Sequence, residues 1–326
     1  MPLAASQRSA GHDVIPMLDD AVSAVESLFA DARHAVAERV TIEGRTVSRV
    51  FDREQRATHG LAWLATYVEA LRQLSAYAQR MAEMGAFGET EDLLVRIGAG
   101  EYLAQILGGI PMSQNEIVRL SDLGLAMSAV ATRITPAVEH LIATGNTPQR
   151  RARLVELMRQ HRDATVGACG LEDTLDSIRE EMRKFAEDRV VPFAQSWHLK
   201  NTYIPLDVLS QMSELGVFNL TIPEDYGGMG LGKESMCVVS EELSRGYIGV
   251  GSLGTRAEIA AELILNSGTE DQKRKWLPKI GSGEALPTAV FTEPNTGSDL
   301  ASLKTRAVRQ GDVYKVYGNK TWITHP

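Results

Sequence analysis

The chain has 326 residues, which corresponds to roughly two domains at about 150 residues each. Its composition, 44% hydrophobic and 23% charged, is that of a globular protein and excludes a disordered chain. A net charge of −8 without a basic patch excludes a typical nucleic-acid-binding protein, and no apolar run reaches the about 18 residues of a membrane span.

Residues 1–165 are predicted to be helical almost throughout. Between Arg56 and Met84 the apolar side chains recur at steps of three and four residues, which is one stripe of an amphipathic helix. A second stripe runs from Leu93 to Leu107 and ends at the glycine pair 108–109. These stripes predict a helix bundle, in which we see no internal repeat and no identifiable chemistry.

The rest of the front half predicts further helices. Ser113 and Glu116 have the spacing of a capping box, which predicts a third helix through Met127. Pro136 is expected to kink or restart the helix, because proline has no N–H for the helical ladder. A fourth helix is predicted at residues 148–161.

The second half begins with more helices and then changes its period. Helices are expected at residues 173–191, 205–215, 233–245, 252–267 and from Thr269, as N-cap, through Trp276. The glycine-rich stretch 226–232 matches neither a dinucleotide-binding nor a P-loop pattern, so we interpret it as a tight structural loop. After Pro287 the period becomes 2, with strands predicted at residues 289–292, 303–309, 313–317 and 320–324.

These patterns predict a mostly α chain in three parts. Residues 1–168 are a helical extension, residues 169–286 a second helical domain, and residues 287–326 the start of an antiparallel β domain. A few short strands without a facing sheet cannot close a core. We therefore expect the chain to be the front part of a longer protein.

The cysteines and histidines bear on compartment and metal binding. Cys169 and Cys237 are too few for a disulfide framework, and the first residues lack the basic flank and apolar block of a secretory signal. We therefore expect a cytoplasmic protein with reduced thiols. The seven histidines have no partner at metal-ligand spacing, so no metal site is expected.

Short motifs in the second half resemble those of a known family. Residues 291–299, FTEPNTGSD, resemble the TEPxxGSD signature of the acyl-CoA dehydrogenases, and residues 321–324 resemble the family's second flavin motif. Residues 222–228, 240–243 and 268–277 are similar to its N-terminal helical domain. The resemblance covers about residues 172–326. A long helical extension in front of such an enzyme is similar to the methylsuccinyl-CoA dehydrogenase subfamily.

The resemblance implies an FAD site. The backbone N–H groups of Phe291 and Thr292, together with the Thr292 hydroxyl, would bind the edge of the flavin ring where negative charge grows. Gly297 would let the backbone approach closely, and Ser298 would reach a phosphate or the pantetheine arm of the substrate.

The second motif supplies the rest of the expected flavin site. Trp322 would form a flat wall against the ring, and the Thr324 hydroxyl would bond flavin N5. Ile323, between them in the sequence, is also expected to be a cofactor-binding residue. Without the combined motif, Trp322 would be read as a core tryptophan, and Thr292 and Thr324 as residues with strand propensity.

The reaction implied by the resemblance is α,β-dehydrogenation of an acyl-CoA. A carboxylate removes the α-proton and the β-hydride passes to the flavin. The family's base is expected beyond Pro326, so the chain alone is expected to be inactive. Glu293 lies in the flavin loop, and Glu241 and Glu242 fit ordinary helix positions, so none of them is assigned that role.

Arg256 bears on the identity of the acyl group. The stretch 254–260 resembles the helix that lines the acyl end of the pocket in relatives. An arginine is costly to bury there unless an anion meets it, and a terminal carboxylate would do so. The alternative is that Arg256 points outward and pairs with Glu258 or a neighbouring helix.

The resemblance implies two partners. One is an acyl-CoA substrate, expected to be a short branched dicarboxylic thioester, and the other is an electron-transfer flavoprotein as electron acceptor. A homo-oligomer is expected, with a dimer favoured over other states. Two other functions stay open: a non-catalytic fragment that serves as a helical oligomerisation module, and a flavin monooxygenase or desulfinase of the same fold.

Overall fold

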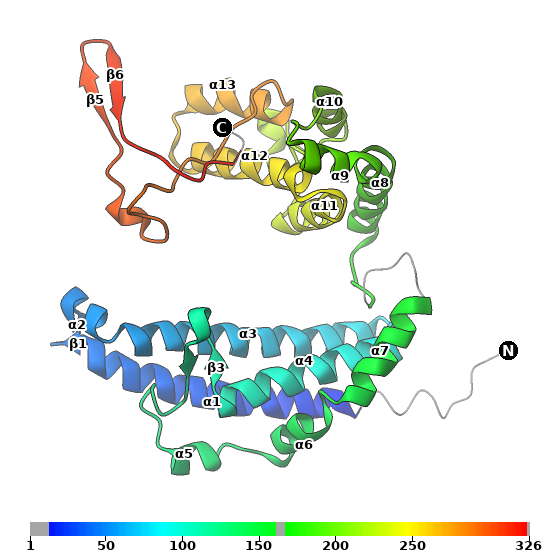
Figure 1. Cartoon of the computed structure of the whole chain (residues 1–326), viewed down its shortest axis with the longest axis vertical. Coiled ribbons are helices and arrows are strands. Elements are labelled where there is room, and N and C mark those ends of the chain that lie inside the picture. The colour runs from blue at the N-terminus through cyan, green and yellow to red at the C-terminus, as the bar shows by residue number, and fades with distance from the viewer. Residues whose placement is uncertain (1–12, 161–166, 325–326) are drawn as a thin grey trace. The chain divides into compact units, whose positions relative to one another are not determined.

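A computed structural model describes residues 13–160 and 167–324 of the chain. The described residues form two compact units, divided between Gly170 and Leu171 (Figure 1). Each unit has its own hydrophobic core. Most described residues are helical, which confirms the predicted fold class. The expected helical character of residues 1–12 and the expected helix end at His161 lie outside the described residues.

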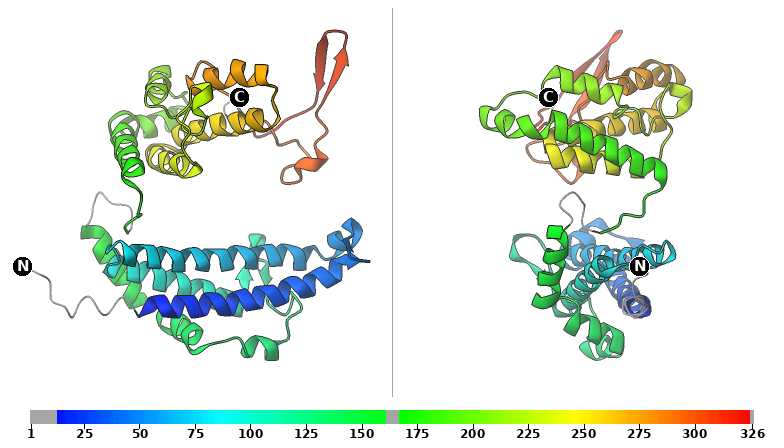
Figure 2. Two further views of the ribbon diagram at one scale, coloured as in Figure 1. Left: turned by 180° about the vertical axis from the view of Figure 1, so that it is seen from behind. Right: turned by 90° about the vertical axis from the view of Figure 1, so that its right-hand side faces the viewer.

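The first unit is a helical bundle with short antiparallel ribbons. Its elements are α1 (Val14–Val40), β1 (Thr41–Ile42), β2 (Arg45–Thr46), α2 (Ser48–Arg53), α3 (Gln55–Glu83), α4 (Glu89–Gly108), β3 (Ile110–Pro111), η1 (Ser113–Asn115), β4 (Ile117–Val118), α5 (Met127–Ala131), α6 (Pro136–Thr144) and α7 (Pro148–Gln160). Helices α1, α3 and α4 lie side by side, and α6 and α7 pack on α4 (Figure 2).

The apolar stripes form the core of this bundle. The stripe between Arg56 and Met84 became α3, and its Leu64 and Leu71 are fully buried. The second stripe became α4, whose Leu103 and Ile106 are also fully buried. Helix α4 ends at Gly108, before a glycine whose φ of 131° lies outside the helical range. Both helix predictions are confirmed.

The predicted helix over residues 113–127 is wrong. Residues 110–111 pair instead with residues 117–118 in an antiparallel ribbon, so the backbone groups there bond across the turn. The Glu116 carboxylate does not cap a helix, because it accepts a hydrogen bond from Arg56 at 3.0 Å. Gly124 has a φ of 92°, and a Cβ there would lie 2.6 Å from the Arg39 guanidinium. Local spacing alone did not show these long-range partners.

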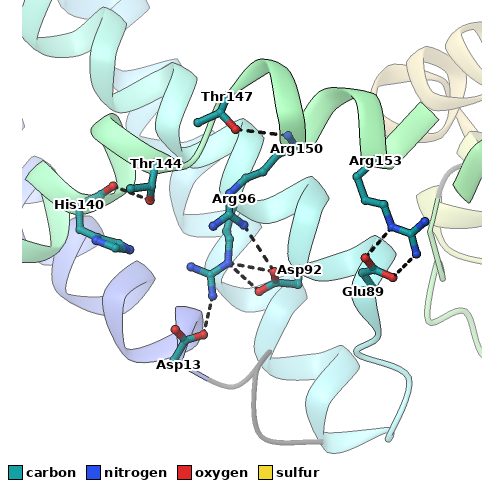
Figure 3. Close-up of polar contacts among 9 residues, drawn as sticks. All are labelled: Asp13, Glu89, Asp92, Arg96, His140, Thr144, Thr147, Arg150 and Arg153. Atoms are coloured by element: carbon teal, nitrogen blue, oxygen red, sulfur yellow. Dashed lines mark hydrogen bonds and ion pairs between the residues drawn. The ribbon is translucent and has the colours of Figure 1, made fainter. Parts of the chain in front are cut away.

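A buried arginine connects three elements of the bundle (Figure 3). Arg96 on α4 is 4% exposed, and its Nε donates to both Asp92 carboxylate oxygens at 2.8 and 2.9 Å. Its Nη2 donates to Asp13, which directly precedes α1. Arg150 on α7 lies 3.9 Å from Asp92. Burial raises the pKa of Asp92 and outweighs the opposing effect of the two arginines.

A second pair joins α7 to α4 at the surface. Arg153 donates two hydrogen bonds to Glu89, both at 2.8 Å, in bidentate geometry (Figure 3). These hydrogen bonds lower the pKa of the Glu89 carboxyl. Both side chains are about half exposed, so solvent screens this pair far more than the one around Arg96.

The second unit is a helical domain followed by a hairpin. Its elements are α8 (Asp173–Arg189), α9 (Val191–Lys200), α10 (Leu206–Glu214), η2 (Glu224–Tyr226), α11 (Lys233–Gly246), α12 (Ile248–Ser267), α13 (Glu270–Gly281), η3 (Leu300–Ser302), β5 (Arg306–Gln310) and β6 (Val313–Tyr317). Helix α11 packs on both α8 and α12, and α12 packs on α13.

Helix boundaries in this unit follow the sequence signals with one exception. Thr269 caps α13, because its hydroxyl accepts from Gln272 N at 3.3 Å and the Gln272 side chain accepts from Thr269 N at 2.9 Å. The exception is α9, where no helix was predicted: it begins directly after α8, with Pro192 in its first turn. A proline is tolerated there, since the N–H groups of a first turn have no partner within the helix.

The glycine-rich stretch 226–232 is a structural loop, as predicted. Its backbone N–H groups are used within the loop: Gly228 N donates to Pro223 O and Gly230 N donates to Ile222 O. A Cβ at residue 228 would lie 1.9 Å from the Ile222 carbonyl oxygen. The loop therefore has a packing reason for glycine, and these N–H groups are not free for a phosphate.

The β region is smaller than predicted. Strands β5 and β6 form a hairpin in which Arg306 pairs with Tyr317 and Gln310 with Val313. Residues 289–292 and 320–324 are not regular strands. Residues 303–305 were predicted to belong to a strand but lie before β5. The N–H groups of residues 304 and 305 donate to a carboxylate and not to a neighbouring strand.

Candidate functional site

The two segments that carry the flavin-like motifs lie side by side. Thr321 N donates to Thr292 O at 3.1 Å, and the Thr288 hydroxyl donates to Thr324 O at 2.7 Å. The residue numbers of the partners run in opposite directions, so the segments are antiparallel. Trp322 directly follows Thr321, the residue that is hydrogen-bonded to Thr292. Residues 30 positions apart in the chain are brought together by this pairing.

The first motif presents unpaired backbone donors. Among the described residues no hydrogen bond involves the N–H of Phe291 or of Thr292. Phe291 is exposed and Thr292 is half-buried, so solvent reaches this segment. Gly297 has open space where a Cβ would be, and Ser298 is exposed. These groups are available to a ligand.

The second motif presents an aromatic surface. Trp322 is 88% exposed and has a φ of 58°, which is rare for a residue with a bulky side chain. The reading of Trp322 as a core tryptophan is therefore wrong. Ile323 is half-buried and Thr324 is exposed, and neither lies in a regular strand. An exposed indole next to free N–H donors is suited to stacking on a flat conjugated ring.

Glu293 lies at the centre of this region and is 7% exposed. Its carboxylate accepts from Lys304 N and Thr305 N, both at 2.9 Å, and from the Thr305 hydroxyl at 2.6 Å. Lys320 Nζ lies 3.0 Å from the same carboxylate. These hydrogen bonds, that of the Thr305 hydroxyl foremost, lower the pKa of Glu293 to about 2. The carboxylate is therefore ionised at any working pH.

The surroundings of the Arg256 side chain bear on the expected substrate contact. It is half-buried on α12, and its Nε is buried without a hydrogen bond among the described residues. The alternative pairing with Glu258 is wrong, because Glu258 pairs with Lys233 Nζ at 3.0 Å. No hydrogen bond or ion pair in the described part of the chain joins Arg256 to the two motif segments.

Known proteins similar to this chain are acyl-CoA dehydrogenases. Residues 172–284 match the family model described as acyl-CoA dehydrogenase, N-terminal domain. Over 96% of its length the chain is 58% identical to (2S)-methylsuccinyl-CoA dehydrogenase of Cereibacter sphaeroides, of which it covers 57%. The second unit is thus similar to the N-terminal domain of the acyl-CoA dehydrogenases, and nearly the whole chain is similar to one curated member of that family.

Other acyl-CoA dehydrogenases match about half of the chain. The chain is 38% identical to mitochondrial isovaleryl-CoA dehydrogenase of Bos taurus, over 48% of this chain and 37% of that protein. A solved acyl-CoA dehydrogenase from Geobacillus kaustophilus is 36% identical, with a TM-score of 0.43, over 48% of this chain and 41% of that one. The chain thus spans about half the length, or less, of these curated relatives.

Two acidic residues of the second unit have surroundings that the sequence did not reveal. Glu242 is 1% exposed, and its carboxylate accepts from Arg183 and Arg245, each at 2.7 Å. These arginines lower the pKa of Glu242 although burial opposes them. Glu293 has the four donors described above. The opposite charges of Glu293 and Lys320, each within or next to a motif, were the available signal for that pair.

The described residues also bear on metal binding, membrane spanning and ligand cavities. No group of three or more metal-ligating side chains occurs in residues 13–160 and 167–324, and no helix there has the length and apolarity to cross a membrane. A cavity of about 590 Å³ opens in the first unit, lined by Tyr67, Ile97, Gly98, Glu101, Tyr102, Gln105, Asn146 and Arg151. The polar groups of its wall bond to one another, from Tyr67 through Gln105 and Glu101 to Asn146.

Proposed function

We propose that this chain is part of an FAD-dependent acyl-CoA dehydrogenase that acts on a short branched dicarboxylic thioester such as methylsuccinyl-CoA. The observation that carries the proposal is the 58% identity to a (2S)-methylsuccinyl-CoA dehydrogenase, which extends over 96% of the chain and so includes the helical extension. The isovaleryl-CoA dehydrogenases, by contrast, match only 48% and 47% of the chain.

The residues of the two motif segments fit FAD. The free N–H groups of Phe291 and Thr292 are donors of the kind that stabilises negative charge at the edge of a flavin ring. Trp322 offers an exposed aromatic face beside them. Ile323, the Thr324 hydroxyl and the backbone at Gly297 complete the proposed cofactor set. When bound, FAD supplies the hydride acceptor of the reaction.

For the substrate we propose two contacts from this chain. The exposed Ser298 hydroxyl binds a phosphate or the pantetheine arm, and Arg256 binds the distal carboxylate of the acyl group. The family's electron-transfer flavoprotein is the proposed electron acceptor. We propose a cytoplasmic location, since the two cysteines of the chain, Cys169 and Cys237, are too few for a disulfide framework.

No glutamate described above is proposed as the base for the α-proton. Glu242 is enclosed by two arginines, and Glu293 is bonded to the two backbone N–H groups of Lys304 and Thr305. Both carboxylates have lowered pKa values, and a low pKa makes a weak base. We propose that the base is supplied by another part of the complete protein.

The test is the visible spectrum of the purified complete protein. We expect a yellow protein whose flavin absorbance bleaches on anaerobic addition of methylsuccinyl-CoA. A colourless protein would favour the non-catalytic helical module. A flavin that does not bleach anaerobically but turns over substrate with oxygen uptake would favour a flavin monooxygenase.

We expect the complete protein to be a dimer. In this proposal the helical extension covers an apolar face that other family members bury by forming tetramers. Deleting residues 1–165 should leave the second unit folded, because that unit has its own core, but should expose the face and raise the oligomeric state. Light scattering of both proteins measures this, and a stable tetramer with the extension present would contradict it.

A further inference from the structure

Glu293 and Lys320 connect three segments of the chain that meet next to the motif residues. The Glu293 carboxylate bonds to the backbone of residues 304–305, just before β5, and to Lys320, just after β6. The Glu293 backbone is fixed as well, since its N–H donates to Thr296 O at 2.8 Å and its C=O accepts from Thr296 N at 3.1 Å. The pair thus closes the base of the hairpin onto the first motif.

Lys320 has a second bond that acts on the orientation of one peptide unit. Its Nζ donates to Phe291 O at 2.8 Å. The carbonyl of Phe291 and the N–H of Thr292 belong to the same planar peptide bond, and none of the described peptide bonds is cis. In a trans peptide the C=O and N–H point in opposite directions. The Thr292 N–H is therefore directed away from Lys320, and it is one of the two donors without a partner.

The position of the Lys320 ammonium group depends in turn on Glu293. Lys320 is half-buried, and the nearly buried Glu293 carboxylate holds its ammonium group in place at 3.0 Å. Without the carboxylate the ammonium would have only the Phe291 carbonyl as a partner in this region. The two residues thus form one unit with Phe291 O.

We propose that Glu293 and Lys320 are positioning residues for the cofactor: they orient the Phe291–Thr292 peptide so that the Thr292 N–H faces a bound flavin. This inference rests on the proposed function, because it assumes that FAD occupies the two motif segments. A donor held in this direction stabilises negative charge on a reduced flavin more than on an oxidised one. Loss of the orientation should therefore lower the reduction potential of the flavin.

The experiment compares Lys320→Met with wild-type complete protein in two measurements, the FAD dissociation constant and the flavin reduction potential. We expect FAD binding to weaken about tenfold, the scale of one hydrogen bond to a charged group, and the potential to become more negative. Lys320→Arg keeps the charge and should restore most of both values. Lys315→Met, which removes an exposed lysine from β6, is the matched control and should match wild type.

The milder variant Thr305→Val removes only the hydroxyl donor to Glu293 and guards against a misfolded Lys320→Met protein. It should shift the potential in the same direction by a smaller amount. Wild-type potentials in both variants, with FAD bound, overturn the positioning role and leave the proposed function standing. A complete wild-type protein that does not bind FAD overturns both.

Discussion

Replacing Arg256 by leucine in the complete enzyme is expected to cost about 2–5 kcal/mol of transition-state binding for a dicarboxylic thioester. This corresponds to a fall of about 30-fold to 5,000-fold in kcat/KM. The physical reason is that the Arg256 Nε is buried and has no hydrogen-bond partner among the described residues. A guanidinium in that state gains most from an anion, since a carboxylate accepts two parallel N–H bonds from it.

The comparison substrate for Arg256→Leu is a neutral acyl-CoA of similar length. Its turnover should fall little or rise, because leucine removes a charge that a methyl-terminated chain cannot satisfy. Arg274→Leu is a suitable control, since Arg274 is exposed on α13 and its ion pair among the described residues is with Glu270, four residues before it. Equal losses on both substrates in Arg256→Leu would mean that the arginine supports the fold and does not bind the acyl group.

The structure already separates the two sequence interpretations of Arg256 in part. One interpretation paired it with Glu258, but Lys233 bonds Glu258 at 3.0 Å and Glu262 at 2.9 Å. Arg256 and Glu258 are only two residues apart, a spacing at which helical side chains do not face each other, whereas Lys233 reaches Glu258 from a different helix. Sequence could not rank the two cations, because that choice depends on how α11 packs on α12.

Elements set by local patterns were predictable, and those set by distant partners were not. The long stripes became α3 and α4, and the capping box at Thr269 formed as expected. The same kind of capping signal failed at Ser113, where Arg56 from another helix takes the Glu116 carboxylate and residues 110–118 form a ribbon. A capping box is therefore informative only when no stronger partner competes for its acidic residue.

The candidate site shows the same division. The motifs placed Thr292 and Trp322 in one region, and the bond between Thr321 N and Thr292 O joins their segments. The exposure of Trp322 and the bonds of Glu293 depend on the hairpin that lies between the motifs in sequence.

A second prediction concerns the stability of the helical extension and does not depend on catalysis. Arg96→Met should destabilise the first unit by about 3–5 kcal/mol, because it removes the main partner of a buried carboxylate. The Asp92 side chain is only 17% exposed, and without Arg96 its nearest cation is Arg150 at 3.9 Å. Hydrogen exchange of the α4 amides measures this loss separately from the second unit. Arg153→Met should cost less than about 1 kcal/mol, since its bidentate bonds to Glu89 are half exposed.

The pH dependence distinguishes an uncompensated charge from lost packing. Burial already raises the pKa of Asp92, so the folded state binds the proton more tightly than the unfolded state. Stability from this group is therefore complete below the unfolded pKa of about 3.9 and is lost as pH rises through the folded pKa. Without Arg96 the folded pKa should rise further, so the deficit of Arg96→Met should be larger at neutral pH than near pH ~4. Adding Asp92→Asn should restore part of the neutral-pH deficit, and a deficit that is equal at both pH values would indicate lost packing alone.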